Sequence, residues 1–112
     1  MSMRQRTDKL QGTLDLLVLR TLAASGALHG FAIAERIGAT SGDRLRVEEG
    51  SLYPALHRME EAGWVTSEWK ASDNNRRARY YRITAGGSRR VAQVERDWMA
   101  HVNAVMRVLK LA

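Results

Sequence analysis

The sequence predicts a mainly α-helical fold with one small β-hairpin, and two kinds of pattern predict it. Apolar residues recur at helical spacing in four segments of the chain. Between the third and the fourth segment lie two short runs rich in aromatic and β-branched residues, separated by a polar turn. With 112 residues and no cysteine, the chain is long enough for one hydrophobic core and offers neither a disulfide framework nor a thiolate metal site.

The first two helices are expected in the N-terminal third of the chain. The apolar stripe of the first helix is Leu14, Leu17, Val18 and Leu22. Gly26 is expected to end this helix, because glycine is the usual residue just past a helix C-terminus. A second helix is predicted over residues 30–37, with Gly38 and the pair Ser41-Gly42 closing it.

A third helix follows, and its two faces differ in chemistry. The core-facing residues are predicted to be Leu52, Ala55, Leu56 and Met59, with Gly63 as the C-terminal stop. The opposite face carries Ser51, Pro54, His57, Arg58 and Glu61, with Tyr53 on its flank. Ser, Tyr, His and Arg donate hydrogen bonds to phosphates and base edges, so this face suits a DNA groove. Pro54 is expected in the first turn, where its missing N–H costs least. For Tyr53 two interpretations remain open: contact at the groove edge, or a ring packed under the hairpin with its hydroxyl in water.

The hairpin and a last helix complete the chain. Strands are predicted over residues 64–70 and 78–84, and Thr84 is expected to cap the helix that follows. One apolar seam along this helix is expected to hold a homodimer together: Val91, Val94, Trp98, Val102, Val105 and Leu109. This order of elements is that of a winged helix-turn-helix. We therefore predict a DNA-binding domain over residues 10–84 and a dimerisation helix over residues 85–112, in one compact unit.

The charge of the chain is concentrated in and just after the hairpin. The basic residues between positions 70 and 90 are Lys70, Arg76, Arg77, Arg79, Arg82, Arg89 and Arg90, and Asp73 is the single acidic residue there, which gives 7 − 1 = +6. This equals the formal net charge of the whole chain, +6. Such a concentration predicts phosphate binding. The alternative, a salt-bridged surface, is disfavoured because few acidic residues lie nearby in the sequence.

Other functional classes lack the residues that they need. The three histidines, His29, His57 and His101, fall on different predicted elements, and no catalytic or phosphate-cradling motif accompanies them, so we expect no enzyme activity, no cofactor and no metal. Residues 1–12 do not resemble a secretory signal, and the most apolar segment, 14–34, is interrupted by polar residues. A cytoplasmic protein without a membrane span is expected.

Four segments together resemble the PadR family of bacterial transcriptional regulators. They are GTLDLLVL at 12–19, HGFAIA at 29–34, GSLYPALHRMEEAGWV at 50–65, and NRRARYYRIT at 75–84 followed by Gly87. The resemblance implies a homodimeric repressor in which the third helix and the wing bind a roughly palindromic operator in double-stranded DNA. Carried over by position, the DNA-binding residues are Ser51, Tyr53, Pro54, His57, Arg58, Asn75, Arg76 and Arg77. The chain resembles a short form of the family, with a single C-terminal helix.

The resemblance also bears on ligands. Some members bind a small aromatic or cationic molecule at the dimer interface, and Trp98 is similar in position to a Trp found there in multidrug-responsive members. The alternative for Trp98 is an indole that only packs within the dimer interface and binds no ligand. The rival function for the whole chain is a protein-interaction module that dimerises through its C-terminal helix without sequence-specific DNA binding. A membrane-surface role is a remote third, because the basic residues lie mainly on the hairpin and not along one helix face.

Overall fold

The computed structural model describes the backbone of residues 3–110 and, within that range, the side chains from residue 13 onward. Its elements follow one another as α1 (Met3–Ser25), β1 (Leu28–His29), α2 (Gly30–Thr40), α3 (Glu49–Glu61), β2 (Val65–Ala71), β3 (Arg77–Ile83) and α4 (Ala85–Val108). The predicted class, helices with a small hairpin in winged helix-turn-helix order, is confirmed. None of the helices in the described range has the length and apolar composition needed to cross a bilayer.

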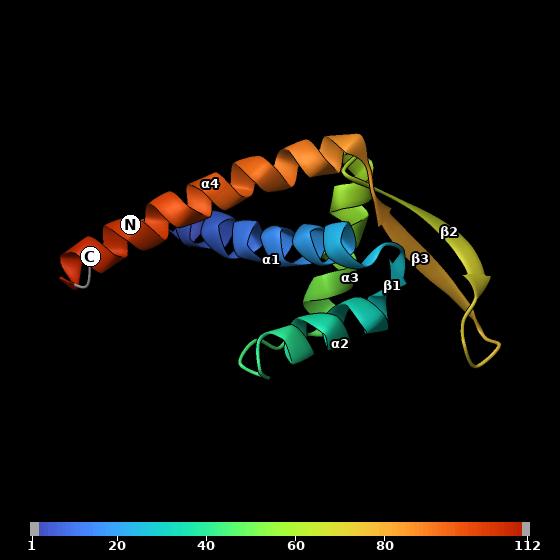
Figure 1. Cartoon of the computed structure of the whole chain (residues 1–112). Helices are drawn as coiled ribbons and strands as arrows, with labels where there is room; N and C mark the ends of the chain where they lie inside the picture. The colour runs from blue at the N-terminus through green and yellow to red at the C-terminus, as the bar shows by residue number, and fades with distance from the viewer. Residues whose placement is uncertain (1–2, 111–112) are drawn as a thin grey trace.

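The molecule is elongated along the pair formed by its two long helices. Figure 1 shows α1 and α4 side by side, with the β2–β3 hairpin projecting from one end of the pair and α2 on the other side of α1 from α4. We call this hairpin with its turn, residues 65–83, the wing. Both chain ends lie at the end of the molecule opposite the wing (Figure 1).

A single hydrophobic core joins the helices to the base of the wing. Its buried members are Val18, Leu19, Leu22, Ile33, Ile37, Leu52, Ala55, Leu56, Met59, Val65, Tyr81 and Val91. The four residues predicted for the inner face of α3 are all among them. The helical spacing therefore identified the buried face of α3 correctly, and the other residues of that helix lie at or near the surface.

The wing is joined by a third strand that the sequence did not predict. The sheet is antiparallel with the order β1-β3-β2, and Leu28 and His29 of β1 pair with Tyr81 and Tyr80 of β3. A strand of two residues is too short to show an alternating pattern, so periodicity could not find it. The strand fastens the start of α2 to the wing.

Helix boundaries differ from the predicted ones at three points. Helix α1 begins at Met3, well before the first residue of its apolar stripe, and ends as predicted at Gly26, whose φ of 79° is in the left-handed region. Helix α2 continues through Gly38 to Thr40 and is capped by Ser41. Helix α3 begins at Glu49, which places Pro54 in the second turn and not the first. The proline ring cannot donate to the carbonyl four residues earlier, so α3 lacks one hydrogen bond at that depth.

The junction between the wing and α4 confirms the predicted cap. The Thr84 hydroxyl oxygen accepts from the Gly87 N–H at 3.0 Å, and the same hydroxyl donates to the Gly63 carbonyl at 2.6 Å. Gly87 lies against the chain just before β2, since a Cβ at this position would be 2.1 Å from the Trp64 carbonyl oxygen. A side chain at position 87 would thus force α4 away from the base of the wing.

Candidate nucleic-acid interface

The outer face of α3 is open to solvent. Ser51, Tyr53, Pro54 and His57 are all exposed, as their helical spacing predicted. His57 Nε2 lies 2.8 Å from a carboxylate oxygen of Glu61 one turn later, and both side chains are exposed. The Tyr53 ring rests on Gly30, where an added Cβ would come within 2.8 Å of it. The Tyr53 ring is therefore packed on one side and exposed on the other, so both of the interpretations given above for this residue stay open.

Arg58 is placed differently from the prediction. Its guanidinium turns back from α3 to α1, where Nη1 and Nη2 donate to the two carboxylate oxygens of Asp15 at 3.0 and 2.7 Å. Asp15 is only 3% exposed. The hydrogen bonds to Asp15 raise the pKa of Arg58 above its already high usual value, so the guanidinium stays charged. The groove-facing guanidinium expected from the helix face is therefore engaged within the protein.

The tip of the wing, residues 72–77, carries unpaired positive charge. Its turn is closed by the Asn75 N–H donating to the Ser72 carbonyl and by the Ser72 N–H donating to the Arg76 carbonyl. Asn75 has a φ of 62°, a left-handed conformation that asparagine tolerates better than most residues. Arg76 and Arg77 are exposed, and within the described part of the chain neither forms an ion pair. Their guanidiniums are available for an external anion.

Other cations of the wing have acidic partners, contrary to the expectation of few nearby carboxylates. Arg79 lies 3.1 Å from Glu60 of α3 and donates to the Ser67 hydroxyl at 2.7 Å. Lys70 and Arg82 both approach Glu68, at 3.7 and 4.0 Å. The sequence count missed these acids because Glu60 and Glu68 precede the counted interval. Glu68 lies two positions before Lys70 on β2 and is brought to Arg82 by strand pairing, and the packing of α3 against β2 brings Glu60 to Arg79.

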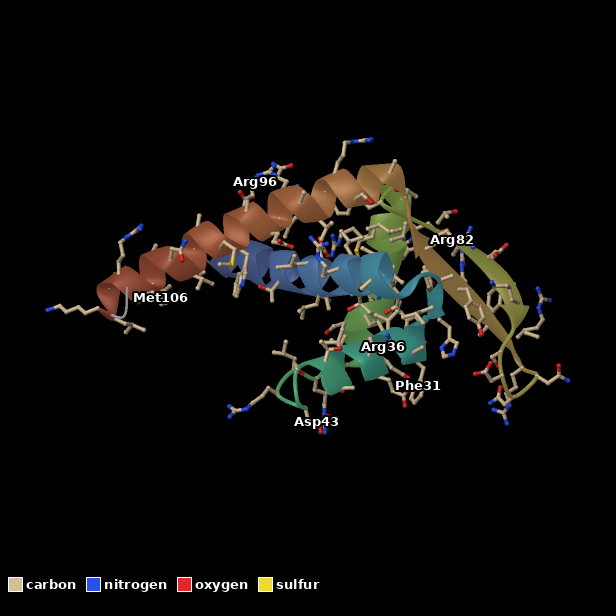
Figure 2. All side chains as sticks on the ribbon, in the orientation of Figure 1. Phe31, Arg36, Asp43, Arg82, Arg96 and Met106 are labelled. Carbon is tan, nitrogen blue, oxygen red and sulfur yellow. The ribbon has the colours of Figure 1, made fainter. Side chains whose placement is uncertain are left out.

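A concave surface lies between the wing and the start of α2, with a volume of about 560 Å³. We call it the wing groove. Its lining includes Phe31 of α2, Tyr53 of α3, Trp69 of β2, and Arg76, Arg77 and Arg79 at the tip and along β3. Figure 2 shows Phe31 at the end of α2 nearest the wing. The groove therefore continues the outer face of α3, through Tyr53, toward the two unpaired arginines.

The predicted dimer seam on α4 divides into two parts. Val91 and Val94 are only 3% and 7% exposed within the single chain, because this half of α4 packs against α1 and the core. These two residues are therefore part of the protomer's own packing. Trp98, Val105 and Leu109 are exposed and Val102 is half-buried. We call these four residues the α4 stripe.

The helix-turn-helix formed by α2 and α3, flanked by a basic wing, defines a winged helix-turn-helix protein. Residues 18–93 match the family described as "Transcriptional regulator PadR-like family". The chain belongs to that family, whose members are transcriptional regulators and not enzymes.

Individual relatives agree with this assignment. A segment of 65 residues is 38% identical to a transcriptional regulator of Mycobacterium tuberculosis, and the match covers 58% of this chain and 57% of that protein. A solved transcriptional regulator from Clostridium thermocellum is 26% identical with a TM-score of 0.79, covering 89% of this chain and 96% of that one. A solved PadR-family regulator from Eggerthella lenta is 30% identical with a TM-score of 0.74, covering 97% and 93%.

Proposed function

We propose that the protein is a sequence-specific regulator that binds double-stranded DNA as a homodimer and acts as a repressor. The observation that carries the proposal is the position of the unpaired Arg76 and Arg77 guanidiniums at a wing tip that flanks the exposed face of α3. Paired charges are partly neutralised by their carboxylates, whereas unpaired ones attract phosphates at full strength. Family membership supports the same reading of this surface.

In this proposal α3 enters the major groove and the wing lies along the phosphate backbone. Ser51, Tyr53 and His57 are the exposed hydrogen-bonding side chains that would approach base edges or nearby phosphates, and Pro54 adds an apolar contact surface. Asn75, Arg76 and Arg77 contact phosphates and set affinity without reading sequence. Arg58 acts indirectly, by holding α3 to Asp15 of α1.

Dimerisation is supported by the α4 stripe. Four apolar side chains in a row along an exposed helix would be in contact with water in a lone protomer, and a second copy related by two-fold symmetry would cover them. Two α3 helices related in this way would bind a roughly palindromic operator with half-site centres about 34 Å apart. Repression follows in this proposal because a bound dimer obstructs access to the DNA that it covers.

An effector site at Trp98 is a narrower proposal. The indole is 37% exposed, and its centroid lies 5.8 Å from that of the His101 ring. An exposed indole face within a dimer interface suits a planar aromatic or cationic molecule. Operator affinity measured with and without a panel of planar dyes and lipophilic cations tests it; unchanged affinity and an unquenched Trp98 would leave the indole with a packing role only.

The main test is a selection of genomic fragments with the purified protein, followed by footprinting. We expect enrichment of duplexes with two symmetric half-sites, protected over both halves. The rival function, a protein-interaction module, predicts a stable dimer that shows no preference among duplexes. Dimerisation without any enriched sequence would therefore favour the rival and contradict the proposal.

A further inference from the structure

Two large aromatic side chains stand exposed on opposite sides of the wing groove. Phe31, at the start of α2, is 59% exposed, and Trp69, on β2, is 56% exposed. Phe31 is on α2, which precedes α3 in the chain, and Trp69 is on β2, which follows it, so neither residue belongs to α3 itself. Both rings line one open groove, and exposed apolar rings grouped in this way are a feature of binding surfaces.

Positive charge accompanies these rings. The guanidinium carbon of Arg77 lies 5.7 Å from the centroid of the Trp69 ring, and that of Arg79 lies 6.0 Å away. Arg79 is also paired with Glu60, whereas Arg76 and Arg77 are not paired. Asp73 is the only carboxylate among the described residues that line the groove. The lining is therefore net positive, with aromatic surface next to the free cations.

His29 adds a hydrogen-bond donor to the same wall. Its Nδ1 accepts from the Ala32 N–H at 3.2 Å, so the neutral imidazole carries its proton on Nε2. The ring is held edge-on to Tyr80, with centroids 5.3 Å apart, and stacks toward Phe31 with centroids 6.5 Å apart. These contacts fix the wall of the groove before any ligand arrives.

We propose that the wing groove holds the sugar–phosphate backbone of one DNA strand. The Phe31 and Trp69 rings pack against deoxyribose, and the phosphates on either side are bound by the Arg76 and Arg77 guanidiniums and by His29 Nε2–H. A DNA strand carries apolar sugar faces next to anionic phosphates, which matches a lining that holds aromatic rings next to cations. The inference rests on the proposed function, and it adds to it a contact that is apolar in character and independent of sequence.

The groove is also in the right place for such a strand. Tyr53 belongs both to the outer face of α3 and to the groove lining. With α3 in the major groove, the strand that borders it would pass Tyr53 and enter the space between α2 and the wing. Strand β1 supports this geometry, since its pairing with β3 sets the distance between the start of α2 and the wing.

The test measures binding of the full chain to a mixed-sequence duplex at several salt concentrations. Phe31→Ala and Trp69→Ala are each expected to weaken binding by about threefold to tenfold while the slope of log K against log salt stays unchanged, because an apolar contact releases no counterions. Trp69→Phe retains an aromatic face and is expected to keep most of the affinity. Leu45→Ala is the matched control, since it shortens an exposed apolar side chain outside the groove lining and should change nothing.

A second measurement needs no variant that affects DNA binding. The wild-type chain is labelled with 5-fluorotryptophan, and its Trp69 resonance is identified with Trp69→Phe. Addition of duplex is expected to shift this resonance and to protect it from a soluble quencher. Unchanged affinity in both alanine variants with an unshifted Trp69 resonance, in a protein that still binds duplex DNA, overturns the groove assignment and leaves the proposed function standing. A wild-type chain that binds no duplex overturns both.

Discussion

Arg58 of α3 and Asp15 of α1 are joined by two hydrogen bonds, of 3.0 and 2.7 Å, between parts of the chain 43 positions apart. The carboxylate is buried and the guanidinium is only partly exposed. Because α1 also packs against α4, this pair connects the helix proposed to enter DNA with the helix proposed to hold the dimer. It fixes how α3 is oriented on the body of the protein.

Replacing Asp15 by Asn should lower the free energy of unfolding by about 1–3 kcal/mol, because it removes the charge opposite a partly buried guanidinium. Urea unfolding checks this. The matched control is Glu95→Gln, which breaks the exposed pair between Arg20 and Glu95 and should cost at most about 1 kcal/mol. Arg58→Ala should weaken binding to all duplexes by a similar factor. A changed preference among sequences in that variant would instead assign Arg58 to base contacts.

The sequence was sufficient for the elements and for most of their faces, because these depend on local spacing. The inner face of α3, the Thr84 cap and the hairpin all follow from residues close together in the chain. The outer face of α3 was also predicted correctly for Ser51, Pro54 and His57, which are exposed. Only Arg58 departs from it, since its side chain is long enough to reach a carboxylate on another helix.

Tertiary contacts account for the other differences. Asp15 lies on the buried side of α1. An acidic residue within an apolar segment indicates that it has a buried partner. The sequence of that segment does not identify the partner. Glu60 reaches Arg79 because α3 packs against β2, and Glu68 reaches Arg82 because β2 pairs with β3. Phe31 and Trp69 were not singled out as site residues, because the groove between them is made by elements distant in sequence.

Removing the two unpaired cations of the wing should reduce the salt dependence of binding. For the double variant Arg76→Ala, Arg77→Ala, the slope of log K against log salt should fall by about 0.9 for each phosphate that the protein no longer neutralises. Fluorescence anisotropy with a labelled duplex measures the slope. Arg96→Ala is the control, because Arg96 projects from α4 away from the wing (Figure 2). An unaltered slope in the double variant would remove the wing tip from the proposed interface.

Gly87 should be among the positions least tolerant of a side chain. Gly87→Ala places a methyl group where the Trp64 carbonyl oxygen would be 2.1 Å away, and we expect a loss of about 3 kcal/mol in the free energy of unfolding. Gly86→Ala is the matched control in the same helical turn, since its nearest contact would be at 3.4 Å. Thermal and urea unfolding compare the two. Equal stability of both variants would show that the junction between the wing and α4 adapts more easily than its geometry indicates.

The two parts of the predicted seam on α4 should respond differently to substitution. Val105→Lys combined with Leu109→Lys puts two charges on the exposed α4 stripe, and a folded monomer is expected because like charges would face each other across the two-fold axis. Val91→Ala, in the core, should lower stability by roughly 1–3 kcal/mol with no such specific effect on assembly. Sedimentation at micromolar concentration, with circular dichroism as the check on folding, separates the two effects.

Asn103→Lys is the control for this experiment, since it adds a lysine at an exposed position of α4 outside the stripe. It should leave the dimer intact. A monomer-forming variant should also lose the cooperative binding of two half-sites, because each α3 helix would then bind alone. A wild-type chain that sediments as a monomer, or a dimer that survives both lysines, would mean that the α4 stripe does not hold two copies together.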